Sequence, residues 1–503
     1  MGRARSPRRT DGAAAGAGLA PIESVARCAA CRSRDGTGMT NGQKVFVAYF
    51  AAFVFMPAVA QGVFGPNLAG IYWVVPANLN AVLTALFVFV STLIGARVYQ
   101  PRPSVGPPGL LRRAIVRAVE FYDRHRLPLS VLALVLSLAY LSAGFLSFRY
   151  MTVGISDQNS VLLLVGNILS TLILIDLTFR IFREPEPVIL RKKQIENLIF
   201  ALSFMALTNG TASSVIALAF LGFALIPSFF QRALFVEKGR SAFRQGAKTL
   251  AAIGIAASLF LAAWVSGEAI KTSSSGNKDL VSSISDVVEE TRSDTAANYF
   301  YYLVSSLSTH YYAHTFMAST PREQILQEAP WPLALPFETL FFRAGYLVGA
   351  ESRRPEIGAF SRLNYVLLTA ERVTERQGTS PGLLAAFEYA FGFPFGPLTA
   401  AIYAVWICSL FDRLVAPGRR LSFAGALLLL GMLLFVFQSP FDMLSIFDNT
   451  TLTFAGVLGI AVLTPRHAPQ TTQEARPARP GVVARPRSSR PILRAEHRSW
   501  RSV

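Results

Sequence analysis

The sequence contains nine long stretches of apolar residues that carry almost no charge. They cover residues 46–60, 71–94, 128–146, 160–177, 215–230, 249–265, 383–410, 421–437 and 444–463. Runs of roughly 18 or more apolar residues are long enough to cross a bilayer as helices. The stretch 215–230 continues one that starts at Ile195, and the polar turn 209–213 divides the two into a hairpin. The sequence therefore predicts an all-α, polytopic membrane protein with about ten transmembrane helices.

Charge alternates between the connections of these predicted helices. The basic segments are 1–44, 97–126, 180–193, 232–248, 412–420 and 465–503. Four of the intervening connections, 63–70, 148–158, 209–213 and 439–443, are short and nearly neutral. Basic connections remain on the cytoplasmic side. Ten crossings then place both termini in the cytoplasm, and residues 268–382 form one long extracytoplasmic loop with ten basic and thirteen acidic residues.

Five regions follow from this topology. They are a disordered basic tail (1–44), seven transmembrane helices (45–267), the long outer loop (268–382), three transmembrane helices (383–464) and a disordered Arg/Pro-rich tail (465–503). Two apolar segments of the loop, 299–312 and 330–350, would raise the number of crossings to twelve if both crossed the membrane. Prolines break the second segment, so we expect it to be re-entrant or to lie at the membrane interface.

The net charge of +18 does not indicate a nucleic-acid partner, because it is spread over cytoplasmic connections. We expect the Arg-rich tails to lie near anionic membrane lipids. No cleavable signal precedes the first apolar run, and Met39 is an alternative start of translation. Cys28 and Cys31 form a single pair without further ligands, so we expect no metal site and no cofactor.

Arginine dominates the cations of the outer loop, with eight Arg against two Lys. Arg372 and Arg376 are four residues apart, so on a helix they would share a face suited to a dianion, because guanidinium matches phosphate oxygens. The alternative is a solvated helix in which Arg372 pairs with Glu375. Arg343 stands in an apolar context that indicates either a functional role or an ion pair with Glu338.

Arg149 follows the third predicted helix on the outer side, where basic residues are disfavoured. It is either a snorkelling anchor or a contact to a lipid phosphate.

His310 and His314 are the only histidines of the loop and would face the same way on a helix. Three interpretations remain open: half of a metal site without a third ligand, a general base for a sugar hydroxyl, or partners of interfacial tyrosines. Asp442 and Asp448 flank the last outer turn, where they would face an outer cavity or cap a helix.

The stretch 378–396 resembles the bacterial oligosaccharide repeat-unit polymerases, the Wzy-type O-antigen and exopolysaccharide polymerases. The similarity lies in a Gly/Ser/Pro turn ending at Gly382, the pair Glu388-Tyr389, and Gly392-Phe-Pro-Phe-Gly396 before a long helix. The spacing of the last two glycines is one residue wider than the family pattern. The residue-specific similarity covers about twenty positions, and the predicted topology agrees with it more loosely.

The resemblance implies an enzyme that joins polyprenyl-diphosphate-linked oligosaccharide repeat units at the outer face of the bacterial inner membrane. Membrane lipids, and possible contacts with a chain-length regulator and a flippase, are the other implied partners. Because the leaving group is a lipid diphosphate, the developing charge needs fixed cations. The expected cations are Arg343, Arg372 and Arg322, with Arg292, Arg149 and Arg376 behind them. The candidate bases for the attacking hydroxyl are His314, Glu388 and Glu338.

Two other functions share most of these features. A ligase would transfer finished glycan from the same lipid carrier to another acceptor. A flippase or exporter would move glycan without covalent chemistry, but such transporters usually carry charges within their spans and show internal repeats, which this sequence lacks. A non-catalytic membrane partner of a synthase is a further alternative. The sequence leaves the sugar, the linkage and the oligomeric state open.

Overall fold

The computed structural model describes residues 38–64, 78–99, 296–347, 357–369, 379–416 and 418–442, together with isolated positions between 117 and 289. These described residues are mostly helical and form no strand, apart from an isolated bridge between Phe235 and Leu421. The predicted tails and the greater part of the predicted spans between 100 and 295 and at 444–463 lie outside them. The number of crossings and the position of the termini therefore remain predictions.

The first described helical run is long and apolar enough to cross a membrane, from Asn41 to Gly62. It consists of α2 (Asn41–Phe50), a π-helical segment η1 (Ala51–Phe55) and α3 (Met56–Phe64). The helix begins four residues before the predicted boundary at 45, because Thr40 and Gln43 form a reciprocal capping box that satisfies backbone N–H groups at its start.

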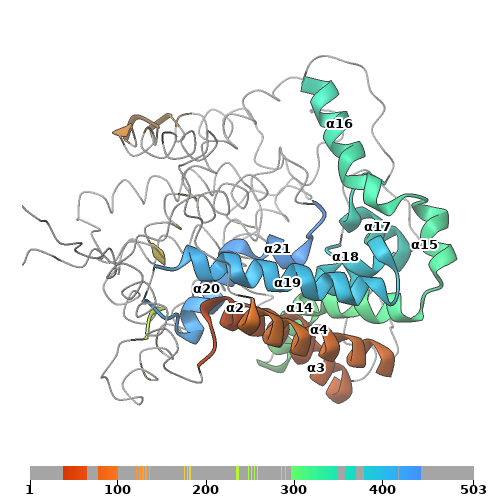
Figure 1. Cartoon of the computed structure of the whole chain (residues 1–503), viewed down its shortest axis with the longest axis horizontal. Coiled ribbons are helices and arrows are strands. Elements are labelled where there is room, and N and C mark those ends of the chain that lie inside the picture. Colours follow the sequence, from red (N-terminus) through yellow and green to blue (C-terminus); the bar gives the residue numbers. More distant parts are fainter. Residues whose placement is uncertain are drawn as a thin grey trace, which may run out of the picture. The chain divides into compact units, whose positions relative to one another are not determined.

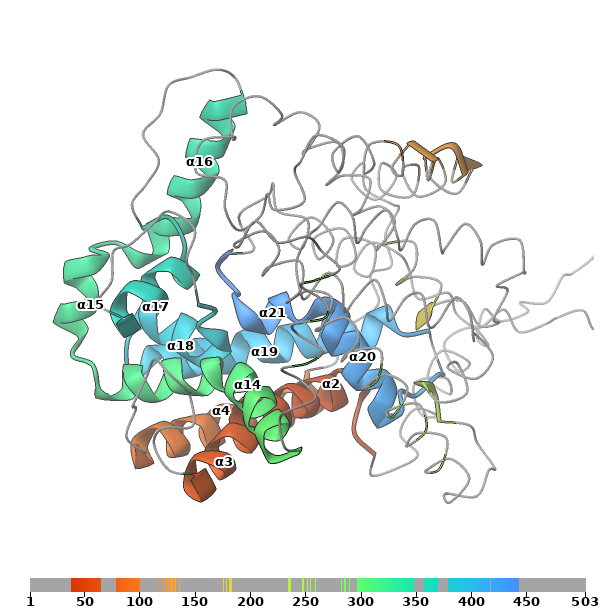
Figure 2. The same cartoon turned by 180° about the vertical axis from the view of Figure 1, so that it is seen from behind.

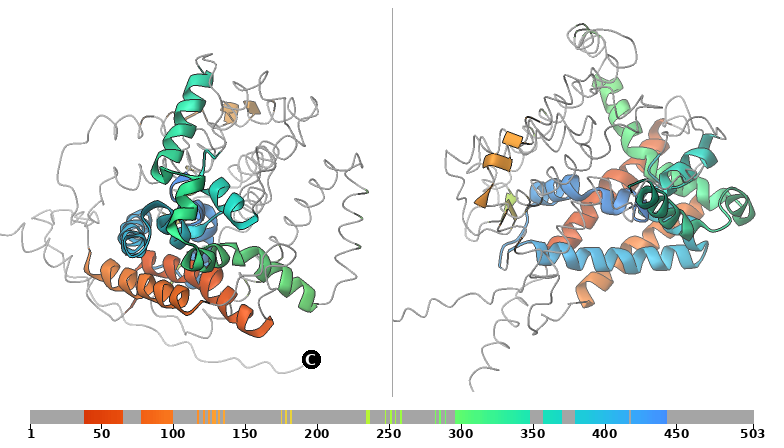
Figure 3. Two further views of the ribbon diagram at one scale, coloured as in Figure 1. Left: turned by 90° about the vertical axis from the view of Figure 1, so that its right-hand side faces the viewer. Right: turned by 90° about the horizontal axis from the view of Figure 1, so that it is seen from above.

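Two further helices meet the same criterion, α4 (Leu79–Val98) and α19 (Phe395–Leu414). At the start of α2, the Gly42 N–H donates to the Asp412 carboxylate (2.8 Å) and the Gln43 amide donates to the Leu93 carbonyl (2.7 Å). The start of α2 therefore lies beside the ends of α4 and α19, so these two helices run opposite to it, side by side (Figures 1 and 3). Three apolar helices of this length indicate a membrane protein.

The apolar stretch 383–410, predicted as one span, contains two helices. The short helix α18 (Gly382–Phe391) ends at Gly392, which has a φ of 71° that side chains disfavour, and Pro394 precedes α19. The two helices then pack against each other. This packing needs a glycine at 396, because a Cβ there would lie 2.8 Å from the Glu388 Cα. The stretch 421–437 is also divided, into α20 (Phe423–Leu433) and α21 (Phe435–Gln438).

The described part of the predicted outer loop is folded into helices. They are α14 (Ala296–Ser319), α15 (Arg322–Glu328), a 3₁₀ turn η4 (Pro332–Ala334), α16 (Leu335–Leu347) and α17 (Phe360–Thr369). The long helix α14 lies against η1, α3, α4 and α18 (Figure 2). The loop thus packs directly on the helices that we assign to the membrane, and this contact creates the candidate site.

Candidate active site

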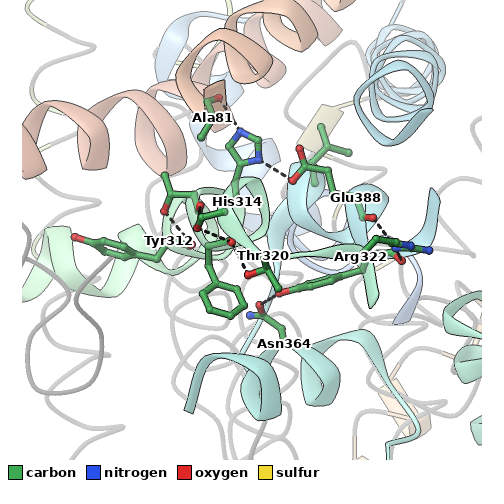
Figure 4. A network of polar contacts seen from close by, with 12 residues as sticks. Ala81, Tyr312, His314, Thr320, Arg322, Asn364 and Glu388 are labelled. Carbon is green, nitrogen blue, oxygen red and sulfur yellow. Dashed lines mark hydrogen bonds and ion pairs between the residues drawn. The ribbon is translucent and has the colours of Figure 1, made fainter. Parts of the chain in front are cut away.

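Two of the three predicted bases lie in contact. His314 comes from α14 and Glu388 from α18, and the distance from the His314 Nδ1 to the Glu388 Oε2 is 2.9 Å. The other ring nitrogen, Nε2, lies 2.8 Å from the carbonyl oxygen of Ala81 in the first turn of α4. Figure 4 shows the imidazole held between these two acceptors. Three helices that are far apart in the sequence therefore meet at one histidine.

The hydrogen bonds fix the protons of the imidazole. A carbonyl oxygen only accepts, so the His314 Nε2 must carry a proton and donate it to Ala81. The contact between the His314 Nδ1 and the Glu388 Oε2 contains one more proton. Either Nδ1 carries it and faces a carboxylate, or Glu388 carries it and faces a neutral ring. In both states the pair has no net charge, which suits a buried position.

The pair is almost shielded from solvent. The His314 side chain is 0% exposed and that of Glu388 is 9% exposed. Burial alone would lower the pKa of His314, but the nearby Glu388 carboxylate and the hydrogen bonds to Glu388 and Ala81 outweigh it and raise the pKa above its ordinary value. This shift favours the state in which an imidazolium faces a carboxylate.

Glu388 is the better placed of the two to act as a base. Both His314 nitrogens already have partners, so the ring has no lone pair left for an incoming hydroxyl group. The Glu388 carboxylate bonds His314 through Oε2 only, and within the described part of the chain no hydrogen bond reaches Oε1. His314 consequently orients the carboxylate and balances its charge, whereas Oε1 remains available to accept a proton.

Arg322 contacts the same helix, but through backbone atoms. Its guanidinium donates to the carbonyl oxygens of Glu388 (3.1 Å), Tyr389 (2.5 Å) and Ala390 (3.2 Å) at the end of α18. The Glu388 carbonyl also accepts from the Gly392 N–H (2.8 Å), the backbone group that closes the last turn of α18. A cation is favourable at a helix C-terminus, where the last carbonyl groups point away from the helix. The predicted diphosphate contact of Arg322 therefore competes with an observed role in fixing the end of α18 (Figure 4).

The neighbour of Glu388 anchors α18 on its other side. The Tyr389 hydroxyl donates to the Asn364 side chain of α17 (2.6 Å), whose amide donates to the Thr379 carbonyl (2.8 Å). Sequence reasoning missed Asn364, because a single asparagine in an amphipathic helix gives no signal of its own. The Glu-Tyr pair thus holds α18 between α14 and α17.

His310 does not join His314. Its ring stacks on Phe53 in η1, with 4.7 Å between the centroids, and its Nδ1 lies 3.5 Å from the Tyr49 hydroxyl. Burial lowers the pKa of His310 to about 3, so the ring is neutral. No group of three or more potential metal ligands occurs among the residues that the structure describes. Among the described residues, the contacts of His310 with Phe53 and Tyr49 agree best with its interpretation as a partner of aromatic side chains.

The remaining predicted residues lie apart or outside the described regions. Glu338, in the first turn of α16, is exposed. Arg343 belongs to α16, but its side chain is outside the described part. The whole of the following residues lies outside it: Arg149, Arg292, Arg372 and Arg376. Asp442 caps a helix, since its carboxylate accepts from the N–H groups of Phe360 (2.8 Å) and Ser361 (3.1 Å) at the start of α17.

Comparison with known proteins gives no relative. No protein-family model, curated protein or solved structure matches this chain.

Proposed function

We propose that this protein polymerises polyprenyl-diphosphate-linked oligosaccharide repeat units at the outer face of the bacterial inner membrane. The observation that carries the proposal is the buried His314–Glu388 contact. It lies where the predicted outer loop meets helices long enough to span a membrane, and Glu388 belongs to the stretch that resembles the polymerases. A lipid-linked substrate would have to react at such a junction, because its diphosphate is anchored in the bilayer.

In the proposed reaction, Glu388 accepts the proton of the attacking sugar hydroxyl through Oε1. The hydroxyl oxygen then forms a bond to the anomeric carbon of the sugar on the second carrier. The bond between this carbon and the diphosphate oxygen breaks, and the electron pair leaves with the lipid diphosphate. His314 keeps the carboxylate oriented, and ionised until it accepts this proton.

The cations that stabilise the leaving diphosphate come from arginines on the predicted outer side: those of the outer loop, and Arg149 after the third predicted helix. Because the Arg322 guanidinium already bonds three carbonyl groups, we assign this role first to Arg343 and Arg372, then to Arg292, Arg149 and Arg376. No metal is required in this scheme, since guanidinium groups supply the charge.

The test is to delete the gene and determine the size of the surface glycan and of the lipid-linked glycans. We expect loss of long chains, with single repeat units on the carrier at the outer face. Complementation with Glu388→Gln should leave the same defect at normal protein levels, whereas Glu323→Gln, which changes an exposed carboxylate of α15, should restore long chains. Finished chains of normal length that stay on the carrier would instead identify a ligase.

A proton-coupled flippase is the second candidate. The structure places an ionisable pair against an apolar helix long enough to span a membrane, which is a frequent arrangement in proton-driven transporters. Repeat units trapped at the inner face of the deletion strain would favour this function and contradict the polymerase.

A further inference from the structure

An exposed apolar strip runs along η4 and α16. Leu333, Phe337 and Phe341 are spaced four residues apart and are 43%, 48% and 71% exposed. Trp331, just before η4, is 79% exposed. Phe337 and Phe341 are four residues apart in α16 and therefore lie on one face of this helix. With Leu333 of η4 and Trp331 just before it, they give the segment four exposed apolar side chains, which we call the aromatic strip.

The other side of the same segment is held by the protein. Leu335 is 5% exposed and belongs to a buried cluster with Tyr389 and Ala390 of α18. The Thr339 hydroxyl also bonds the Gly358 carbonyl. The segment is therefore anchored through one face, while the aromatic strip on another face has no covering element in the described part of the chain. Exposed apolar patches of this kind mark interaction surfaces.

The anchor lies close to the start of a helix that is long and apolar enough to span a membrane. Ala390 lies five residues before the start of α19, which is long and apolar enough to span a membrane, and a span begins at the level of the lipid headgroups. Two further aromatic side chains are exposed here: Phe393 (80%) in the turn between α18 and α19, and Phe395 (63%) at the start of α19. Aromatic residues, tryptophan above all, concentrate at this level of a bilayer.

We propose that the aromatic strip inserts into the outer surface of the bilayer and holds α16 at the interface, beside the entry of α19. The inserted face of such a helix reaches about 5–10 Å below the headgroups. This inference needs a membrane location for the chain and the predicted orientation with the loop outside, and it is independent of the reaction proposed for Glu388.

The experiment uses the full chain in lipid vesicles. The native cysteines are replaced, and single cysteines at Phe337, Phe341 or Glu323 are labelled with an environment-sensitive fluorophore. Leu83 on α4 is exposed on a helix long enough to span the membrane and provides the lipid-facing reference. Nitroxide groups near the headgroup end or near the tail end of the lipid chains, and iodide in the water, serve as quenchers.

We expect labels at 337 and 341 to have blue-shifted emission and to be quenched mainly by the shallow nitroxide, whereas the label at 323 is quenched by iodide. Equal quenching of all three labels by iodide would overturn the proposal, because the strip would face water. Protection of 337 and 341 from both iodide and nitroxide would also overturn it, since another protein surface would then cover the strip.

Discussion

The buried contact between His314 and Glu388 predicts an asymmetric response to the loss of either side chain. We consider His314→Leu, Glu388→Leu and the double variant. Each replacement keeps roughly the volume of the side chain, so the main change is in charge and hydrogen bonding. The two side chains are 0% and 9% exposed, so water cannot substitute for the missing partner.

The expected loss of unfolding free energy in each single variant is the lowest cost at which the remaining group can stay buried without its partner. In His314→Leu, Glu388 avoids an unpaired buried charge by taking up a proton. At pH 7 this costs about 3.7 kcal/mol, calculated from an ordinary carboxyl pKa of about 4.3 and about 1.36 kcal/mol per pH unit. A lone His314 is already neutral near pH 7 and leaves only an unpaired Nδ1, which costs about 1–3 kcal/mol. The double variant removes both penalties and should be close to the wild type.

The assay is reversible unfolding of the purified protein in mixed detergent, followed by circular dichroism at pH 7 and at pH 5. We expect the penalty of His314→Leu to fall from about 3.7 to about 1 kcal/mol between these pH values, because the carboxyl group is protonated more cheaply. The penalty of Glu388→Leu should not decrease in the same way. An equal, pH-independent penalty for both single variants, or a double variant less stable than either, would refute the reasoning.

Three further predictions follow from the contacts of α18. Arg322→Ala should lower the free energy of unfolding by about 1–3 kcal/mol, because three carbonyl groups lose a charged donor, and Arg322→Lys should restore only part of it; no loss in the alanine variant would contradict the capping role. Gly396→Ala should destabilise by about 1–3 kcal/mol in the same assay, because its Cβ would lie 2.8 Å from the Glu388 Cα. The control is Gly431→Ala in α20, where nothing lies within 4 Å and alanine should be neutral or stabilising. Finally, the raised pKa of His314 means that its stabilising contribution is complete below the unfolded pKa of about 6.5 and is lost as the pH rises through the folded value. A pH titration of stability should show this loss in the wild type and not in the double variant, and a wild type equally stable across that range would argue against the ion pair.

The sequence identified side chains of the site but not their relation. Glu388 is a candidate base because it belongs to the stretch that resembles the polymerases, and His314 because it is one of the two histidines of the loop, each a possible general base. Their contact, 74 residues apart in the chain, depends on how α14 packs against α18, and no local pattern encodes that packing. The Ala81 carbonyl, which removes His314 as the free base, is a backbone atom and has no signature in the sequence.

Helix boundaries differed for local reasons that can be named. Hydrophobicity alone made residues 383–410 one span, but the positive φ of Gly392 and the following Pro394 end one helix and begin another. The role of Arg322 could not be foreseen either, because its three acceptors belong to a helix terminus that exists only once this break is made. Composition thus predicted the helical class well, and tertiary packing decided the roles.

The hydroxyl of Tyr49 has a consequence for how the protein is made. It accepts from the Leu383 N–H at the start of α18 (3.1 Å) and so satisfies a backbone donor in a buried position. With ten residues, α18 is too short to cross a bilayer, and unsatisfied N–H groups disfavour its entry into an apolar environment. Its partner lies 334 positions earlier in the chain and is synthesised first. We therefore expect the first helix to act as the template on which α18 docks late in biogenesis, so that α18 can assemble correctly only after the ribosome has completed nearly four-fifths of the chain.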